Sequence, residues 1–307
     1  METRRIGSLT VSVVGLGCNN FGVRMGRRET DAVVGAALDA GITLFDTADV
    51  YGGTLSEEYL GAALGARRDE VSVATKFGVP YEGHAGGAGP AYIRRAVEDS
   101  LRRLGTDHVD LYQLHGPDPK TPIAETLGTL GELVDEGKVR ELGCSNFTRA
   151  MLEEAAGAVA DDAPRFVSVQ NQYNLLHREP EDGVLAFCDR TQTAFLPFFP
   201  LGAGLLSGKY RSTVKIPRGT RLASRPERRK VDFGRKQLAK VAALDAAAHD
   251  EGHTVLDLSV AWLLSHQVVA SVIAGASTTA QVAANGDAGR WKPGAALLVR
   301  AETIAPR

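Results

Sequence analysis

Short apolar segments alternate with segments of helical spacing along almost the whole chain, and this alternation constrains the fold more than any other feature of the sequence. Eight apolar segments are predicted strands, at residues 12–18, 42–46, 71–77, 109–114, 139–144, 166–170, 194–199 and 268–274. Predicted helices separate most of the strands, at residues 29–40, 90–104, 121–135, 148–160, 181–188, 234–249, 255–265 and 278–285. A further helix is predicted to begin at residue 56, with Ser56 as its N-cap. Strands alternating with helices are joined by parallel crossovers. Eight such units in 307 residues predict an α/β fold of the closed (β/α)8 TIM-barrel type.

The alternative fold is an open doubly wound sheet, which would carry a glycine-rich phosphate loop early in the chain. Residues 15–20 begin like such a loop, but the third glycine is missing where a helix would begin. No linker, change of composition or further repeat divides the sequence. We therefore expect residues 1–307 to form a single barrel domain with long βα loops.

Composition and charge exclude several classes of protein. A hydrophobic content of 44% supports a sizeable core, and a formal net charge of −2 gives the chain no bias toward nucleic acid. Three widely spaced cysteines favour neither a disulfide framework nor a zinc ribbon, and they fit a reducing compartment. No segment approaches the roughly 18 apolar residues of a membrane span. We expect a cytoplasmic protein without a nucleic-acid or membrane partner, and a monomer by default.

Polar side chains stand where the predicted strands end, at the edge where a (β/α)8 barrel carries its active site. Asp46 ends the second predicted strand, Lys76 lies near the end of the third, and His115 follows the fourth. Tyr51 comes five residues after Asp46, in a turn. Singly, each of these residues has an ordinary structural interpretation, but together at successive strand ends they favour a site. Later strands end near Ser145, Asn146 and Gln170.

The first four residues make chemical sense as one group. A tyrosine titrates near ~10 in water, which is too high for an efficient acid at neutral pH. Lys76 beside Tyr51 would favour the phenolate and lower the pKa of the phenol. A partly buried ammonium needs a carboxylate, which Asp46 supplies, while His115 can orient the reacting oxygen. The set predicts protonation of a developing alkoxide, as in hydride addition to a carbonyl from a cofactor.

Asp46, Tyr51, Lys76 and His115 resemble the catalytic tetrad of the aldo-keto reductases, in the same order and at similar spacing. The surrounding sequence is also similar, at 46–52 (DTADVYG), 104–115 (LGTDHVDLYQLH) and 137–147 (GKVRELGCSNF). The resemblance covers about residues 9–285 and implies NADPH-dependent reduction of an aldehyde or ketone, with Tyr51 as the proton donor. Histidine rather than glutamate at position 115 favours carbonyl reduction over double-bond reduction within the family.

The resemblance also implies where the cofactor binds. Ser145, Asn146 and Gln170 correspond to the family residues that hold the nicotinamide carboxamide. Phe198 takes the place of the aromatic residue that stacks on the nicotinamide, where tyrosine is commoner. The loop at 200–209 resembles the pyrophosphate clamp of the family, and its candidate residues are Pro200, Leu201, Gly202, Gly204 and Lys209.

The adenosine end departs from the pattern of NADP-dependent family members. Their cations are absent at Gly275 and Gln281, although Asn285 is retained and Ser277 and Thr278 could bond a 2′-phosphate. Residues 209–230 hold nine Lys or Arg against one acid, either as an electrostatic funnel for a phosphorylated cofactor or as a solvated loop. We expect NADPH as the cofactor, with NAD as the alternative.

A function of another class stays open. Some relatives of the family are channel-associated subunits whose bound cofactor reports redox state, and such a subunit would keep the tetrad and turn over slowly. The expected substrate is a small carbonyl or alcohol, including sugars and secondary metabolites, chosen by loops at 116–121, 209–230 and 286–307. His249 and His253 are four residues apart, but no third ligand is evident, so we predict no metal.

Overall fold

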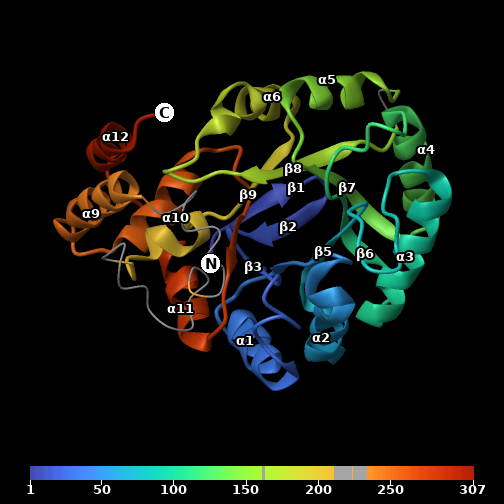
Figure 1. Ribbon diagram of the computed structural model, residues 1–307, viewed down its shortest axis with the longest axis horizontal. Helices are drawn as coiled ribbons and strands as arrows, with labels where there is room; N and C mark the ends of the chain where they lie inside the picture. Colours follow the sequence, from blue (N-terminus) through green and yellow to red (C-terminus); the bar gives the residue numbers. More distant parts are fainter. Residues whose placement is uncertain (161–162, 211–222, 224–233) are drawn as a thin grey trace.

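The computed structural model describes residues 1–160, 163–210, 223 and 234–307. Its main sheet has eight strands, parallel at every pairing, in the order β10-β3-β4-β5-β6-β7-β8-β9. The strands are β3 (Val14–Gly17), β4 (Leu44–Asp46), β5 (Ser72–Phe77), β6 (Val109–Leu114), β7 (Val139–Ser145), β8 (Phe166–Gln172), β9 (Ala194–Phe198) and β10 (Val272–Gly275). The ring closes at Phe195, whose N–H donates to the carbonyl of Val268 (2.7 Å) and whose carbonyl accepts from Ala270 (3.0 Å). The expected (β/α)8 barrel is confirmed (Figure 1).

Helices surround the strands in Figure 1. They are α1 (Arg27–Asp39), α2 (Leu55–Leu64), α3 (Pro90–Leu104), α4 (Ile123–Asp135), α5 (Arg149–Gly157), α6 (Val184–Thr191), α9 (Arg235–His249), α10 (Val255–Ser265), α11 (Thr279–Ala288) and α12 (Ala295–Ile304). The helices with clear end signals match their predicted bounds. Pro90 opens α3 and Gly105 ends it in a left-handed conformation, with its N–H on the carbonyl of Leu101. None of the described helices is both long enough and apolar enough to cross a membrane.

Ser56 is not the N-cap of α2, contrary to the sequence expectation. Thr54 occupies that position, and Ser56 lies buried within the first turn of the helix. The Ser56 hydroxyl donates to the carbonyl of Cys18 (3.0 Å) and shares a hydrogen bond with the hydroxyl of Thr47 (2.8 Å). Ser56 therefore ties α2 to the chain that leaves β3 and β4, beside the end of the barrel where polar residues gather.

An N-terminal hairpin, which sequence analysis missed, plugs the other end of the barrel. Strands β1 (Thr3–Ile6) and β2 (Leu9–Ser12) pair antiparallel, and Figure 1 shows them over the centre of the ring. The hairpin contributes Ile6, Leu9 and Val11 to a buried cluster with side chains of the main sheet, which include Leu44, Ala74, Leu111 and Leu196. The N–H of Ser12 donates to the hydroxyl of Thr43, just ahead of β4. The amino-terminal end of the barrel is therefore closed.

The C-terminal tail contains a helix rather than only a loop. Sequence analysis predicted no helix in the tail 286–307, and this is wrong, because α12 lies there and packs against α9; a role of the tail in substrate specificity stays a prediction. Leu297 and Ala301 of α12 are buried, and Glu302 accepts a hydrogen bond from the indole of Trp262 (3.2 Å). These contacts fix the tail to the helical layer.

Candidate active site

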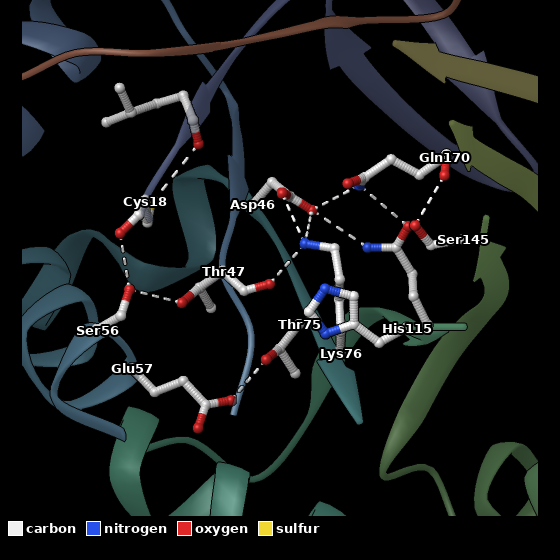
Figure 2. Close-up of polar contacts among 12 residues, drawn as sticks. Cys18, Asp46, Thr47, Ser56, Glu57, Thr75, Lys76, His115, Ser145 and Gln170 are labelled. Atoms are coloured by element: carbon white, nitrogen blue, oxygen red, sulfur yellow. Dashed lines mark hydrogen bonds and ion pairs between the residues drawn. The ribbon is translucent and has the colours of Figure 1, made fainter. Parts of the chain in front are cut away.

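The four expected catalytic residues lie at the carboxyl ends of three neighbouring strands. Asp46 is the last residue of β4, Lys76 is the penultimate residue of β5, and His115 directly follows β6. Tyr51 begins the short 3-10 turn η1 (Tyr51–Thr54) after β4. Figure 2 shows Asp46, Lys76 and His115 converging from these strands. Strand order brings Asp46, Lys76 and His115 together, because β4, β5 and β6 are adjacent in the sheet.

The turn that carries Tyr51 depends on Gly52. Gly52 has φ 63°, in the left-handed region that side chains disfavour, and a Cβ there would lie 2.5 Å from the carbonyl oxygen of Phe21. Gly53 has the same φ, but a Cβ on it would meet nothing within 4 Å. Only at Gly52 do both the backbone and the available space exclude a side chain, so the position of Tyr51 rests on that residue.

Lys76 and Asp46 form a buried ion pair. Lys76 Nζ donates to Asp46 Oδ1 (2.8 Å), to Asp46 Oδ2 (2.7 Å) and to the carbonyl of Thr47 (2.8 Å). These contacts use all three ammonium donors. Burial lowers the pKa of Lys76, but the Asp46 carboxylate and the Tyr51 phenol outweigh burial, so the pKa is raised overall. The ammonium therefore stays charged although Lys76 is fully buried.

Tyr51 lies against both Lys76 and His115. Lys76 Nζ is 5.1 Å from the centroid of the Tyr51 ring, and the His115 ring meets Tyr51 edge-on with centroids 5.8 Å apart. Burial raises the pKa of Tyr51 above its ordinary value, while the charge of Lys76 acts in the opposite direction. The sequence expectation of a lowered pKa for Tyr51 is wrong. The effect of Lys76 has the expected sign, but desolvation of the phenolate exceeds it.

His115 is held as a neutral imidazole. Burial, and secondarily the charge of Lys76, lower the pKa of His115 to about 3. The main chain of His115 is fixed on both sides, since its N–H donates to Phe77 and its carbonyl accepts from the side-chain amide of Asn146 (2.9 Å). Its buried Nδ1 has no hydrogen-bond partner in the described residues. A neutral imidazole can orient a polar group without contributing a charge.

Two glutamine amides also reach the Asp46 carboxylate. Gln170 Nε2 donates to Asp46 Oδ1 (2.8 Å), and Gln113 Nε2 donates to the same oxygen (3.2 Å). The two glutamines are bonded to each other, from Gln170 Nε2 to Gln113 Oε1 (3.3 Å). Sequence analysis missed Gln113. The available signal was a glutamine near the end of a predicted strand, two residues before His115.

The three residues expected to hold a nicotinamide carboxamide lie together at the ends of β7 and β8. The hydroxyl of Ser145 donates to the main-chain carbonyl of Gln170 (2.7 Å), as does the N–H of Asn146 (3.1 Å). Asn146 is exposed and has φ 62°. Neither Ser145 nor Asn146 caps the next helix, because Thr148 is the N-cap of α5. The amide of Asn146 also reaches Ser145 Oγ, so polar groups of the three residues form one connected cluster.

The loop expected to take the pyrophosphate follows β9. Phe198 ends β9 half-buried, with its ring edge-on to that of Phe199. The loop 200–209 then contains the left-handed residues Gly202, Ala203 and Gly204. A Cβ on Gly204 would lie 3.0 Å from Lys209 Nζ, so the glycine lets the ammonium approach the main chain. The N–H groups of Gly202 and Gly204 donate within the loop, to the carbonyls of Phe199 (2.9 Å) and Leu201 (2.8 Å), so the group that this loop offers to a diphosphate is the ammonium of Lys209. Of the other loop candidates, Pro200 is buried and Leu201 is half-buried.

Residues at the expected adenosine end lie around the start of α11. The N–H and hydroxyl of Ser277 both donate to the side-chain carbonyl of Gln281 (2.8 and 3.1 Å). The hydroxyl of Thr278 accepts from the N–H of Gln281 and caps the helix. Gly275 is exposed at the end of β10 and Asn285 is buried in α11. Of the basic segment 209–230, residues 211–222 and 224–230 lie outside the described part of the chain.

A second polar cluster, which sequence analysis also missed, lies beside the site. The buried carboxyl of Asp49 has no hydrogen-bond partner on either oxygen in the described residues. Burial, and then the charge of Glu57, raise the pKa of Asp49 to about 7. Glu57 itself is buried and paired with Arg103 (2.6 Å). Two buried hydroxyls, on Tyr92 and Tyr112, likewise find no hydrogen-bond partner among the residues that the structure describes.

Comparisons with known proteins agree on one family. The model of the "Aldo/keto reductase family" matches residues 13–292. The chain is 34% identical over 275 residues to the aldo-keto reductase yakc [NADP(+)] of Schizosaccharomyces pombe, covering 86% of this chain and 80% of that protein. It is 31% identical to a glycerol dehydrogenase from Gluconobacter oxydans, with a TM-score of 0.85 over 98% of this chain and 94% of the other. An aldo-keto reductase from Klebsiella pneumoniae in complex with NADPH is 28% identical, with a TM-score of 0.82 over 99% and 95% of the two chains.

Proposed function

Since the chain belongs to the aldo/keto reductase family, we propose that it reduces a small aldehyde or ketone to the alcohol with NADPH, using Tyr51 as the proton donor. The observation that carries the proposal is the buried ammonium of Lys76, which Asp46 holds at two oxygens and which stands against the Tyr51 ring. An ion pair buried this deeply at a strand end is costly for folding, so a role in chemistry accounts for it.

The residues at the barrel mouth fit a nicotinamide dinucleotide. Ser145, Asn146 and Gln170 would hold the carboxamide, Phe198 would stack on the ring, and the loop 200–209 would take the diphosphate. When bound, the cofactor supplies the hydride that converts a carbonyl to an alkoxide. Gly275, Ser277, Gln281 and Asn285 would meet the adenosine end. The names of two relatives, one NADP(+)-dependent and one in complex with NADPH, support NADPH over NADH.

The side chains of this protein supply the proton that the alkoxide needs to become an alcohol. Tyr51 gives its hydroxyl proton to the oxygen of the former carbonyl, and the phenolate left behind faces Lys76. The ammonium stabilises that phenolate strongly because it is buried and water is excluded. His115, being neutral, holds the carbonyl oxygen by a hydrogen bond and cannot compete with Tyr51 as an acid. The same groups run the reverse oxidation of an alcohol, which agrees with a glycerol dehydrogenase among the relatives.

The test is NADPH oxidation by purified protein with a panel of aldehydes and ketones. We expect turnover by the wild type and a loss of about 100-fold or more in Tyr51→Phe, the scale of a general acid, with cofactor affinity retained. Tyr59→Phe removes a hydroxyl from α2, outside the site, and should behave as wild type.

Two outcomes would contradict the proposal. Full turnover by Tyr51→Phe would remove Tyr51 from the acid role. Tight NADPH binding by a wild type that oxidises it no faster than the blank would favour a redox-sensing subunit instead of a reductase.

A further inference from the structure

We propose that Gln113 is a positioning residue for proton transfer: its side-chain amide holds the carboxylate of Asp46, and through Asp46 it sets how strongly Lys76 acts on Tyr51. The inference rests on the proposed function, in which Lys76 stabilises the phenolate of Tyr51. Gln113 touches neither Tyr51 nor Lys76 by any hydrogen bond found in the described residues. Its influence must therefore pass through the carboxylate.

The position of Gln113 follows from strand register. Gln113 of β6 is paired with Lys76 of β5, so both side chains point to the same face of the sheet, inside the barrel. Gln113 is fully buried. Gly143 of β7, the next residue in register, leaves space for it, because a Cβ there would lie 3.0 Å from Gln113 Cγ. The barrel interior is thus shaped to hold a long polar side chain at this point.

The orientation of the Gln113 amide is fixed by chemistry. Its nitrogen faces Asp46 Oδ1 at 3.2 Å, and its oxygen accepts from Gln170 at 3.3 Å. The reverse orientation would set the amide oxygen against a carboxylate and two N–H groups against each other. A hydrogen bond to a charged group in a dry interior is about twice as strong as a neutral one. Gln113 therefore has a defined donor role rather than a filling role.

Gln113 and Gln170 differ in what else they serve. Gln170 connects Asp46 to Ser145 and Asn146, the residues proposed to hold the cofactor. Gln113 has no such second task, since Gln170 is the one other hydrogen-bond partner of its side chain in the described part of the chain. When the carboxamide engages Gln170, Gln113 is the amide that remains dedicated to the carboxylate. Figure 2 shows Gln170 between Ser145 and Asp46 in this arrangement.

Loss of the Gln113 donor should weaken the proton donor in a defined direction. Without the Gln113 amide, less of the negative charge of Asp46 is compensated by hydrogen bonds. More of the positive charge of Lys76 is then offset by Asp46, so the positive potential at Tyr51 falls and the pKa of the phenol rises. A lost hydrogen bond to a charged group corresponds to roughly a tenfold fall in the rate of reduction. By the same argument, the pH above which the rate of reduction declines should move upward by about half a unit to one unit.

The experiment compares wild type, Gln113→Met, Asp46→Asn and the double variant, with Ser168→Ala as a control. Methionine matches glutamine in length and lacks the donor. Ser168 is a buried barrel-interior residue close to Gly143, and its hydroxyl has no partner among the described residues. Single-turnover rates of carbonyl reduction are measured across pH, cofactor affinity is measured by fluorescence titration without substrate, and the free energy of unfolding is measured in denaturant. Gln113→Met should show the slower rate and shifted profile, with cofactor affinity within about threefold of wild type.

The double variant decides whether Gln113 acts through Asp46. Gln113→Met should change the pH profile of the reduction rate in an otherwise wild-type protein. In a protein that already carries Asp46→Asn, Gln113→Met should cause no further change in that profile. An equal effect on both backgrounds, or a uniform fall in rate without a change in profile, would overturn the inference. If the wild type reduces carbonyls and Gln113→Met has the same rate and pH profile, only the role of Gln113 is contradicted. If the wild type reduces no carbonyl, the proposed function is contradicted as well.

A second variant covers the case in which Gln113→Met fails to fold. Gln113→Glu keeps size and polarity, and its carboxyl next to Asp46 should retain a proton at low pH and donate it like the amide. We expect near wild-type rates at low pH and a steep loss as that carboxyl ionises. Rates equal to wild type at every pH would overturn the inference.

Discussion

Two carboxyl groups three residues apart meet opposite environments in this protein. Asp46 is surrounded by donors, from Lys76 and two glutamines. Asp49 is equally buried, but neither of its oxygens has a partner in the described residues, and it shares its surroundings with Glu57 and three phenols. Asp46 is the last residue of β4 and faces these donors, whereas Asp49 lies three residues beyond the strand end. Asp46 serves the site, whereas ionised Asp49 is a burden on stability.

Asp49→Asn should stabilise the protein at high pH and not at low pH. The pKa of Asp49 is raised from 3.8 to about 7, so the folded state retains a proton that the unfolded state releases. This contribution is complete below about pH 4 and is lost as the pH rises to about 7. Asparagine does not ionise, so the free energy of unfolding of Asp49→Asn at pH 8 should exceed that of the wild type by up to about 4 kcal/mol. Denaturant unfolding of both proteins at about pH 4 and pH 8 measures this; an equal difference at the two pH values would contradict it.

His115 should not titrate near neutrality. Its pKa is lowered from 6.5 to about 3, so its contribution to stability is present above pH 6.5 and is lost as the pH falls toward 3. Histidine ring resonances in NMR spectra, assigned with His115→Asn, should show no shift for His115 between about pH 5 and pH 8. A midpoint near 6.5 for His115 would contradict a neutral, desolvated imidazole.

The sequence predicted the positions of the reactive side chains, but it did not predict how burial and neighbouring charges together shift their pKa values. Polar residues at strand ends are visible as interruptions of apolar segments, which is why Asp46, Lys76 and His115 could be placed. The sign of the Tyr51 pKa shift could not be predicted, because the desolvation that raises this pKa depends on how the folded chain packs around the phenol. Gln113 was missed for a related reason. Its partner Asp46 is 67 residues away along the chain.

At the scale of elements, local end signals separate what was predicted from what was missed. Helix α3 has proline at its start and glycine past its end, and the segment 90–104 was predicted with those bounds. Helix α12 begins after Gly294 without a side-chain cap, and it was missed. The hairpin of β1 and β2 was missed because its exposed residues Thr3, Arg5 and Thr10 dilute the apolar pattern. Elements that depend on tertiary packing lack a local signature.

The turn η1 offers a matched pair of variants. Gly52 and Gly53 share φ 63°, so alanine at either should cost about 1 kcal/mol for the backbone conformation. Only at Gly52 would the new Cβ also meet the carbonyl of Phe21, at 2.5 Å. Gly52→Ala should therefore move Tyr51 and reduce carbonyl turnover by tenfold or more, whereas Gly53→Ala should remain close to wild type. Equal turnover in the two variants would show that the clash does not reach Tyr51.

The whole molecule divides its tasks between two ends of one barrel. The carboxyl ends of the strands hold the tetrad, and the amino ends are closed by the hairpin. The sequence predicted the first end, since strand order follows from the alternation and polar residues interrupt the apolar segments there, but it did not predict the plug. That residues 1–307 form a single domain stays a proposal of ours. The division implies that damage at the closed end should affect stability and spare chemistry.

Ile6→Ala tests this separation. Ile6 is fully buried in the plug, so truncation should lower the free energy of unfolding by about 2–5 kcal/mol. Carbonyl turnover per folded molecule should stay within about twofold of wild type, because the site is at the other end. Thr10→Ala changes an exposed residue of the same hairpin and should alter neither quantity. A loss of turnover by folded Ile6→Ala would mean that the two ends are coupled.

The hairpin also decides how the protein can be handled. Glu2 accepts a hydrogen bond from Val13, just ahead of β3, so the first residues of the chain lie on the plugged side. A solid support or fusion partner attached ahead of Met1 would therefore face away from the opening. Reactants would keep free passage from the bulk solution on an immobilised column, and only an attachment made on the opposite rim would obstruct them.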